Sequence, residues 1–197
     1  MSFRIEEKLS IDRYNIVNFK KQLEDKNIKQ IYKRRKIHSV YFENNNNEMF
    51  TDSIEALTPR KKIRVRNYPE TDDNEYYLEI KISSVEGRFK KRTIIDKSKF
   101  DSFKTKGILD PQYGLCKPLL YVSYEREYFK VGDVRISIDN NIKYRAFSNN
   151  VYINEENSIV EIKTSIRKNL DELIEDFPYQ RKRFSKYCNA VEKVILK

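Results

Sequence analysis

The sequence is poor in the residues on which several common kinds of site depend. It has one histidine, His38, which excludes a histidine-based catalytic triad or metal cluster. None of its four glycines lies in the GxxxxGK(S/T) pattern of a P-loop, so that nucleotide site is excluded as well. The two cysteines, Cys116 and Cys188, form no CxxC or other metal-ligand spacing. We interpret both as ordinary thiols in a reducing compartment.

Long apolar runs are also missing. No stretch approaches the roughly 18 apolar residues of a membrane-spanning helix. Residues 1–8 lack the apolar core of a signal peptide. We therefore expect a soluble, cytoplasmic protein, unless a membrane-protein partner tethers it.

The composition is that of a folded chain. Of the 197 residues, 39% are hydrophobic and 13% are aromatic, which is enough for a real core. No repeat, linker or change in composition divides the sequence, so we expect one domain over residues 1–197. The net charge is +10, from 40 basic and 30 acidic residues. This charge favours an anionic partner, such as a nucleotide, polyphosphate, nucleic acid or an acidic membrane surface.

Charged residues recur at every second position in at least six short segments. Side chains of a strand alternate between its faces, so each segment places a charged row opposite an apolar row. Two interpretations stay open, because alternation does not distinguish inside from outside. The charged rows either face water or converge into an array of cations suited to a phosphate-rich polyanion. The segments are Lys62–Arg66, Leu78–Ile82, Lys90–Arg92, Tyr124–Arg126, Val134–Asp139 and Val160–Lys163.

The patterns along the chain predict about eight or nine antiparallel strands and a few helices. This number of strands suits a closed barrel or a wrapped sandwich. Helices are expected over residues 13–24, 48–57 and 97–106, and over most of the last thirty residues, with a break near Pro178. Late in the chain we expect strands at 119–130, 134–139, 143–147 and 159–164, with a turn at Asn140 and Asn141.

An ordered set of short pieces spans nearly the whole chain. The set resembles the polyphosphate-polymerase domain of the vacuolar transporter chaperone (VTC) family, in the CYTH-like superfamily of triphosphate tunnel metalloenzymes. The resemblance implies an α+β fold: an antiparallel β-barrel tunnel with flanking helices, a C-terminal helix and charged rows that point inward. The pieces are Glu6–Leu9, Val40–Phe42, Lys62–Arg66, Tyr77–Lys81, Lys90–Arg92, Tyr124–Arg126, Val134–Asp139, Ile159–Lys163 and Arg183–Tyr187.

The resemblance also implies roles for single residues. Glu161 matches a metal-binding carboxylate for Mn²⁺ or Mg²⁺, and Glu79 is expected to assist in the tunnel. Lys90 and Arg92 are chosen over Lys91 by strand parity. For each residue, a solvated face or an ordinary ion pair is the alternative. The implied catalytic residues are Lys8, Arg64, Arg66, Arg126, Arg135 and Lys186. The implied phosphate-binding residues are Lys81, Lys90, Arg92, Tyr124, Lys163, Arg183 and Ser185. Of these, Arg183, Ser185 and Lys186 are expected on the C-terminal helix, with Arg183 and Lys186 on one face.

One departure from the wider superfamily bears on the activity. Its hydrolases carry Glu-x-Glu-x-Lys on the first strand, and here Arg4 stands at the first position. Loss of that carboxylate favours the polymerase branch, which transfers the γ-phosphate of ATP to a growing polyphosphate chain and releases ADP. The alternatives are a metal-dependent triphosphatase of the same fold and a non-catalytic polyphosphate-binding domain. Nucleic acid is the weakest partner, because interleaved stacking platforms are absent.

Overall fold

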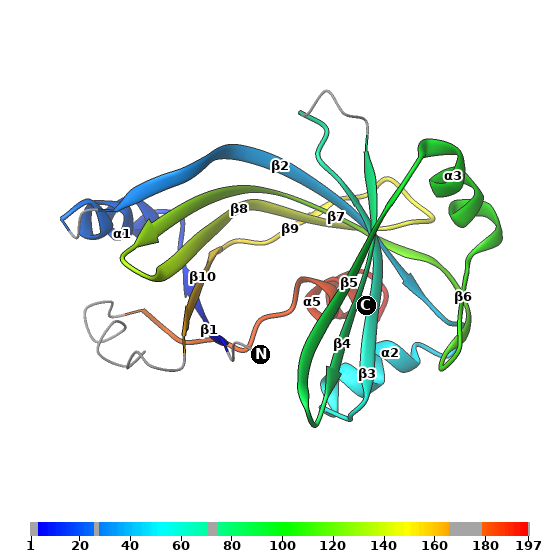
Figure 1. Ribbon diagram of the computed structural model, residues 1–197. Coiled ribbons are helices and arrows are strands. Elements are labelled where there is room, and N and C mark those ends of the chain that lie inside the picture. Colours follow the sequence, from blue (N-terminus) through cyan, green and yellow to red (C-terminus); the bar gives the residue numbers. More distant parts are fainter. Residues whose placement is uncertain (1–3, 26–27, 71–74, 166–178, 197) are drawn as a thin grey trace. The chain divides into compact units, whose positions relative to one another are not determined.

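The protein is described by a computed structural model that covers residues 4–25, 28–70, 75–165 and 179–196 (Figure 1). Ten strands and four helices lie in these residues. The first five strands are β1 (Arg4–Ile11), β2 (Lys29–Glu43), β3 (Arg60–Asn67), β4 (Tyr76–Ser84) and β5 (Gly87–Ile95). The others are β6 (Ile108–Asp110), β7 (Gly114–Val131), β8 (Val134–Ala146), β9 (Ile153–Asn154) and β10 (Ser158–Ser165). The helices are α1 (Asn15–Glu24), α2 (Glu48–Ile54), α3 (Lys97–Lys106) and α5 (Lys186–Val194).

The strands form one sheet in the order β1-β10-β8-β7-β2-β3-β4-β5, with β6 on β7 and β9 on β8. The pairings β1–β10, β10–β8, β2–β3, β3–β4 and β4–β5 are antiparallel. The predicted α+β class with antiparallel strands is therefore confirmed. Within the described residues, β1 and β5 end this order and are not paired with each other. No described helix has both the length and the apolar character of a membrane span.

The chain divides into two compact units. Unit 1 comprises residues 1–35, 124–142 and 154–184, and unit 2 comprises residues 36–123, 143–153 and 185–197. Strands β2, β7, β8 and β9 each contribute residues to both units. The single domain over residues 1–197 stays a prediction.

Unit 1 has an apolar core on one face of its strands. The core joins Leu9 and Ile11 of β1 to alternate residues in the first half of β8 and the middle of β10, namely Val134, Ile136, Ile138, Val160 and Ile162. Phe19 and Leu23 of α1 are fully buried against it. The side chain of Asp12 accepts hydrogen bonds from the backbone N–H groups of Tyr14, directly before α1, and Asn15, its first residue, which stabilises the start of the helix. Most residues that alternate with them are charged, so a charged row lies on the opposite face; it includes Lys8, Arg135, Asp139, Glu161 and Lys163.

The strands of unit 2 also have one apolar face and one polar face. Ile63 and Val65 of β3 pack with residues of β2 and with Met49 of α2. Phe100 and Phe103 of α3 pack against the same core. The residues that alternate with Ile63 and Val65 on β3 are basic, so the second face of this part of the sheet is polar.

The predicted break after residue 139 is wrong. Strand β8 continues through Asn140 and Asn141 to Ala146, so the strand expected over residues 143–147 is part of it. Asn141 takes a left-handed conformation with φ of 51°. Asparagine tolerates this conformation better than most residues, and a single such residue distorts the strand without ending it. Strand β7 likewise starts at Gly114 and not near residue 119.

The C-terminal helix is shorter than predicted. Residues 166–178 lie outside the described residues, and residues 179–185 are not helical. The backbone of Gln180 and Lys182 is hydrogen-bonded to β1, which holds this segment extended. Helix α5 begins at Lys186, and the hydroxyl of Ser185 accepts the backbone N–H of Cys188 as its N-cap. The expectation that Arg183 lies on this helix and shares a face with Lys186 is therefore wrong.

Candidate functional site

The polar face of unit 2 is centred on Glu79. In the strand register, Glu79 of β4 lies between Arg64 of β3 and Arg92 of β5. Arg66 and Lys90 are two residues away on the same strands, so their side chains point to the same face. Lys91, between Lys90 and Arg92, has the opposite parity. We call Arg64, Arg66, Glu79, Lys90 and Arg92 the Glu79 cluster.

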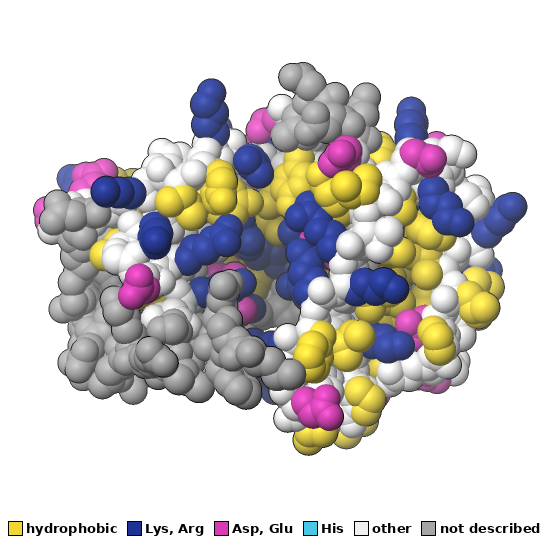
Figure 2. All heavy atoms as spheres, in the orientation of Figure 1, with side chains coloured by type: hydrophobic (Ala, Val, Ile, Leu, Met, Phe, Trp, Pro, Cys, Tyr) yellow, Lys and Arg dark blue, Asp and Glu magenta, His cyan; other side chains and the backbone are white. Residues whose placement is uncertain are grey.

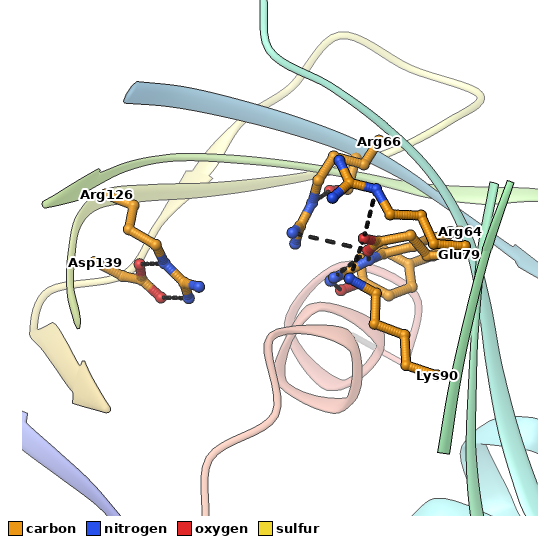
Figure 3. A network of polar contacts seen from close by, with 9 residues as sticks. Arg64, Arg66, Glu79, Lys90, Arg126 and Asp139 are labelled. Atoms are coloured by element: carbon orange, nitrogen blue, oxygen red, sulfur yellow. Dashed lines mark hydrogen bonds and ion pairs between the residues drawn. The ribbon is translucent and has the colours of Figure 1, made fainter. Parts of the chain in front are cut away.

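Four cationic side chains of this cluster surround one carboxylate. Three of them, Arg64, Arg66 and Lys90, are labelled beside Glu79 in Figure 3. Arg64 donates from Nε and Nη2 to Oε2 of Glu79, at 2.8 and 2.6 Å. Lys90 Nζ lies 2.5 Å from Oε1. Nη1 of Arg66 and Nε of Arg92 are each 3.7 Å from a carboxylate oxygen. Residues of two strands thus converge on a single acidic group.

The electrostatics of the Glu79 cluster favour an anion. The Glu79 side chain is fully buried, whereas those of Lys90 and Arg92 are 42% and 38% exposed. Burial raises the pKa of Glu79, but Arg64, Arg66 and Lys90 outweigh it and hold this pKa well below the usual range. The carboxylate therefore stays charged, and cations outnumber it. Lys and Arg side chains are also widespread on the surface in Figure 2.

The start of α5 joins the same face of unit 2. Tyr41 of β2 accepts a hydrogen bond from Nη1 of Arg64 at 2.8 Å, and its ring stacks on Tyr187. Lys62 of β3 donates to the hydroxyl of Ser185 at 2.9 Å. Burial raises the pKa of Tyr41, but Arg64, Arg66 and Lys186 lower it by more, so this pKa is lowered overall. The charge of Lys186 thus acts on the same phenol as those of the two arginines.

A second polar group lies in unit 1, where β1 pairs with β10. Lys8 is opposite Glu161, and Glu6 is opposite Lys163. Lys163 Nζ lies 2.8 Å from Glu161 and 3.6 Å from Glu6. Lys8 Nζ lies 3.1 Å from Glu6 and 3.9 Å from Glu161, and it also donates to the carbonyl of Phe184 at 2.9 Å. We call Glu6, Lys8, Glu161 and Lys163 the Glu161 cluster.

Glu161 carries the charge that a metal ligand requires. Burial raises its pKa, but Arg126, Lys163 and Lys8 outweigh it, so this pKa lies well below the usual range. No group of three His, Cys, Asp or Glu side chains in the described residues forms an all-protein metal site. Mg²⁺ is often held by one or two carboxylates together with substrate phosphates. Glu161 and Glu6 fit that kind of donor set.

Arg126 and Arg135 are placed differently in unit 1. Arg126 forms a two-point ion pair with the buried carboxylate of Asp139, at 2.5 and 2.7 Å (Figure 3). Its guanidinium lies 5.4 Å from the ring centre of Tyr124. Arg135 is exposed, and its guanidinium lies 5.6 Å from the ring centre of Tyr128. Asp139 therefore binds the guanidinium of Arg126, for which the family resemblance implies a contact with phosphate.

The structure thus groups the predicted residues within each unit. In unit 2, Arg64, Arg66, Lys90 and Arg92 meet at Glu79. Lys81 is exposed on β4, in register with Lys62 and Lys90. In unit 1, Lys8 and Lys163 meet at Glu161, while Arg183 is exposed ahead of α5. The roles of these residues stay predictions.

Several polar residues of the site were not assigned from sequence. Two had a usable signal, because Glu6 shares the parity of Lys8, and Lys62 shares that of Arg64. Asp139 lay in a recognised segment, but its partner was not foreseeable from alternation. Tyr41 and Tyr187 also lay in recognised segments, but no role was assigned to them, since a tyrosine on a half-buried strand or helix is ordinarily a packing residue.

Comparison with known proteins identifies a family and a fold. The sequence model of the VTC domain family matches residues 2–112 and 108–195. No curated protein matches the sequence significantly. A candidate adenylate cyclase from Bacillus halodurans has a similar structure, with a TM-score of 0.66 and 12% identity, over 98% of this chain and 97% of that one. Another from Vibrio parahaemolyticus has a TM-score of 0.61 and 12% identity, over 97% of this chain and 98% of that one.

The third similar structure belongs to a protein with a named activity. It is a candidate adenylyl cyclase from Hippeastrum with a dominant triphosphatase activity. The TM-score is 0.62 at 14% identity, over 98% of this chain and 97% of that one. At such identities the likeness establishes the fold alone, and it agrees with the CYTH-like tunnel fold implied by the sequence.

Proposed function

The chain belongs to the VTC domain family, and on that premise we propose that it is a polyphosphate polymerase. It transfers the γ-phosphate of ATP to the end of an inorganic polyphosphate chain and releases ADP. The observation that carries the proposal is the Glu79 cluster, in which four cationic side chains surround a single buried carboxylate. A cluster with this excess of positive charge suits a ligand that carries several negative charges close together.

The two kinds of cation in the cluster have different tasks. Arginine presents a planar fork that binds two phosphate oxygens, and lysine acts as a compact charge. Arg64 and Arg66 are almost fully buried and are held by Glu79, so they are oriented before a ligand arrives. Lys90 and Arg92 are partly exposed and are able to follow a chain of phosphates. Phosphoryl transfer depends mainly on such positioning and charge neutralisation.

The Glu161 cluster would bind the metal ion. Glu161, with Glu6 beside it, would hold Mn²⁺ or Mg²⁺, and that ion would neutralise phosphate charge during transfer. Lys163 and Lys8, together with Arg126, hold the pKa of Glu161 below the usual range, and the two lysines supply charge for phosphate at the same place.

A triphosphatase is the second candidate function. It is favoured by the activity of the Hippeastrum relative and by the two carboxylates of the Glu161 cluster. It is disfavoured by Arg4, which replaces the first carboxylate of the hydrolase pattern. The two activities use the same tunnel fold and differ in whether water or a phosphate chain accepts the phosphoryl group.

The products of ATP turnover test the proposal. The protein is incubated with ATP and Mn²⁺, polymer is detected on a gel, and ADP and free phosphate are assayed. Long polyphosphate with ADP is the result expected of a polymerase. Free phosphate without polymer would instead identify a triphosphatase. Binding of polyphosphate without turnover would identify a binding domain.

A further inference from the structure

Glu43, at the end of β2, fixes the start of α2. Its side chain is buried, with 2% of the residue exposed. Oε1 accepts the backbone N–H groups of Asn44 and Met49, at 2.9 and 3.2 Å, and Oε2 accepts that of Phe50 at 3.0 Å. These three bonds leave the carboxylate little freedom to move.

The same carboxylate reaches the start of α5. The hydroxyl of Tyr187, the second residue of α5, donates to Oε2 of Glu43. Tyr187 is 1% exposed, and burial, together with the charge of Glu43, raises the pKa of its phenol far above the ordinary value. The phenol therefore stays protonated and acts as a donor. The first turn of α5 is thus hydrogen-bonded to the end of β2, and through the Glu43 carboxylate it is linked to the start of α2.

From Tyr187 the contacts continue to the Glu79 cluster within unit 2. The ring of Tyr187 stacks on Tyr41, with 5.3 Å between centroids and 29° between planes. The Tyr41 hydroxyl accepts from Arg64, which in turn donates to Glu79. Lys186 directly precedes Tyr187, and its charge acts on Tyr41. Tyr187 therefore links the first turn of α5, which begins at Lys186, to Arg64 through the ring and hydroxyl of Tyr41.

We infer that Tyr187 is a positioning residue, whose hydrogen bond to Glu43 holds Lys186 beside the Glu79 cluster for phosphate binding. The inference rests on the proposed function. The geometry has one direct consequence: loss of the hydroxyl frees the first turn of α5, and Lys186 then contributes less to binding. Tyr187 itself does not touch phosphate in this scheme.

A double-mutant cycle tests the inference with inorganic tripolyphosphate as the ligand and calorimetry as the readout. The variants are Lys186→Ala, Tyr187→Phe and the combination of the two. Each single variant should raise the dissociation constant by roughly five- to twentyfold. The combined variant should have the same dissociation constant as the single variant with the larger effect. Tyr113→Phe is the matched control, because Tyr113 is also buried in unit 2 and donates to a carboxylate, Asp52, at 2.7 Å. It should lose stability without losing affinity.

The outcomes separate the inference from the proposed function. If the unmodified protein does not bind tripolyphosphate, the proposed function itself fails. If it binds and Tyr187→Phe binds equally well, the positioning role is overturned. The role is also overturned if the two single effects multiply in the combined variant, because Tyr187 then does not act through Lys186. If Tyr187→Phe does not fold, Glu43→Gln replaces it, because this variant weakens the same hydrogen bond at its acceptor. Its affinity for tripolyphosphate, alone and combined with Lys186→Ala, is then compared in the same way.

Discussion

Glu79 and Arg64 form an ion pair in which one carboxylate oxygen takes both hydrogen bonds. Oε2 of Glu79 accepts from Nε and Nη2 of Arg64, and Oε1 faces Lys90. Arg64 also donates from Nη1 to Tyr41. The guanidinium is therefore fixed by two partners, while the carboxylate is shared among several cations. Glu79 thus acts as a permanent counter-charge for a group of side chains that would otherwise repel one another.

The first prediction concerns this counter-charge. Glu79→Gln should lower the free energy of unfolding by about 3 to 5 kcal/mol, because it leaves several close cations without their buried partner. Added tripolyphosphate should restore more stability to this variant than it adds to the unmodified protein, since the ligand supplies the missing negative charge. Urea unfolding with and without tripolyphosphate measures both effects.

Glu70→Gln is the control for that experiment. Glu70 pairs with Lys36 at 3.4 Å, and both side chains are about half exposed. Such surface pairs contribute within about 1 kcal/mol, so this variant should behave nearly as the unmodified protein does. An equal gain from tripolyphosphate in all three proteins would show that Glu79 does not lie where phosphate binds.

The second prediction follows from the lowered pKa values of Glu79 and Glu161. A carboxyl whose pKa is lower in the folded state stabilises the fold above its unfolded pKa, which is about 4.3 for glutamate. That stabilisation is lost as the pH falls toward the folded pKa. The free energy of unfolding should therefore fall steeply below about pH 4.3. In Glu79→Gln, part of this acid dependence should be missing. Urea midpoints at a series of pH values from neutral to acid check this, and an unchanged slope in the variant contradicts it.

How far the sequence predicts the site can be judged from β5. Strand parity alone selected Lys90 and Arg92 over Lys91, and the structure directs both at Glu79. This succeeded because alternation between faces is a property of every strand, whatever its neighbours. The same reasoning predicted the charged faces of β3, β4 and β10.

Partners across the sheet were harder to predict. Nothing in the local pattern indicates that Asp139 pairs with Arg126, because this contact depends on the register between β7 and β8. The helix start at Lys186 was missed for a related reason, since hydrogen bonds from β1 hold the preceding residues extended. Tyr187 could not be singled out either, because its partner Glu43 is 144 residues away. Long-range contacts of this kind are decided by the whole fold.

The third prediction concerns Glu161. Glu161→Gln keeps the size of the side chain but removes the charge that would hold the metal ion, so turnover should fall to background while the fold is retained. Glu156→Gln, an exposed change close by in the sequence, should leave turnover unchanged. Initial rates over a range of Mn²⁺ concentrations provide the measurement. A near-normal rate with the same metal dependence in Glu161→Gln would exclude Glu161 as the ligand.

The fourth prediction concerns the salt dependence of polyphosphate binding and the two faces of β5. Binding of long polyphosphate should weaken with ionic strength, and each engaged Lys or Arg should contribute roughly 0.7 to 0.9 to the log–log slope, as for nucleic acids. Arg92→Ala should therefore lower the slope by about one. Lys91→Ala removes the same charge from the opposite face of the same strand and should change the slope much less. Equal slopes in the two variants would mean that polyphosphate does not distinguish the two faces.

The measurement that tests the central claim most directly follows the γ-phosphate itself. ATP labelled in the γ-phosphate is incubated with Mn²⁺ and a short polyphosphate primer, using the unmodified protein and Arg66→Ala. The account predicts that the unmodified protein moves label into polyphosphate chains longer than the primer, with one ADP released for each phosphate added. Arg66→Ala should lose most of this activity. Label found only in free phosphate, or equal chain growth by both proteins, would contradict the account.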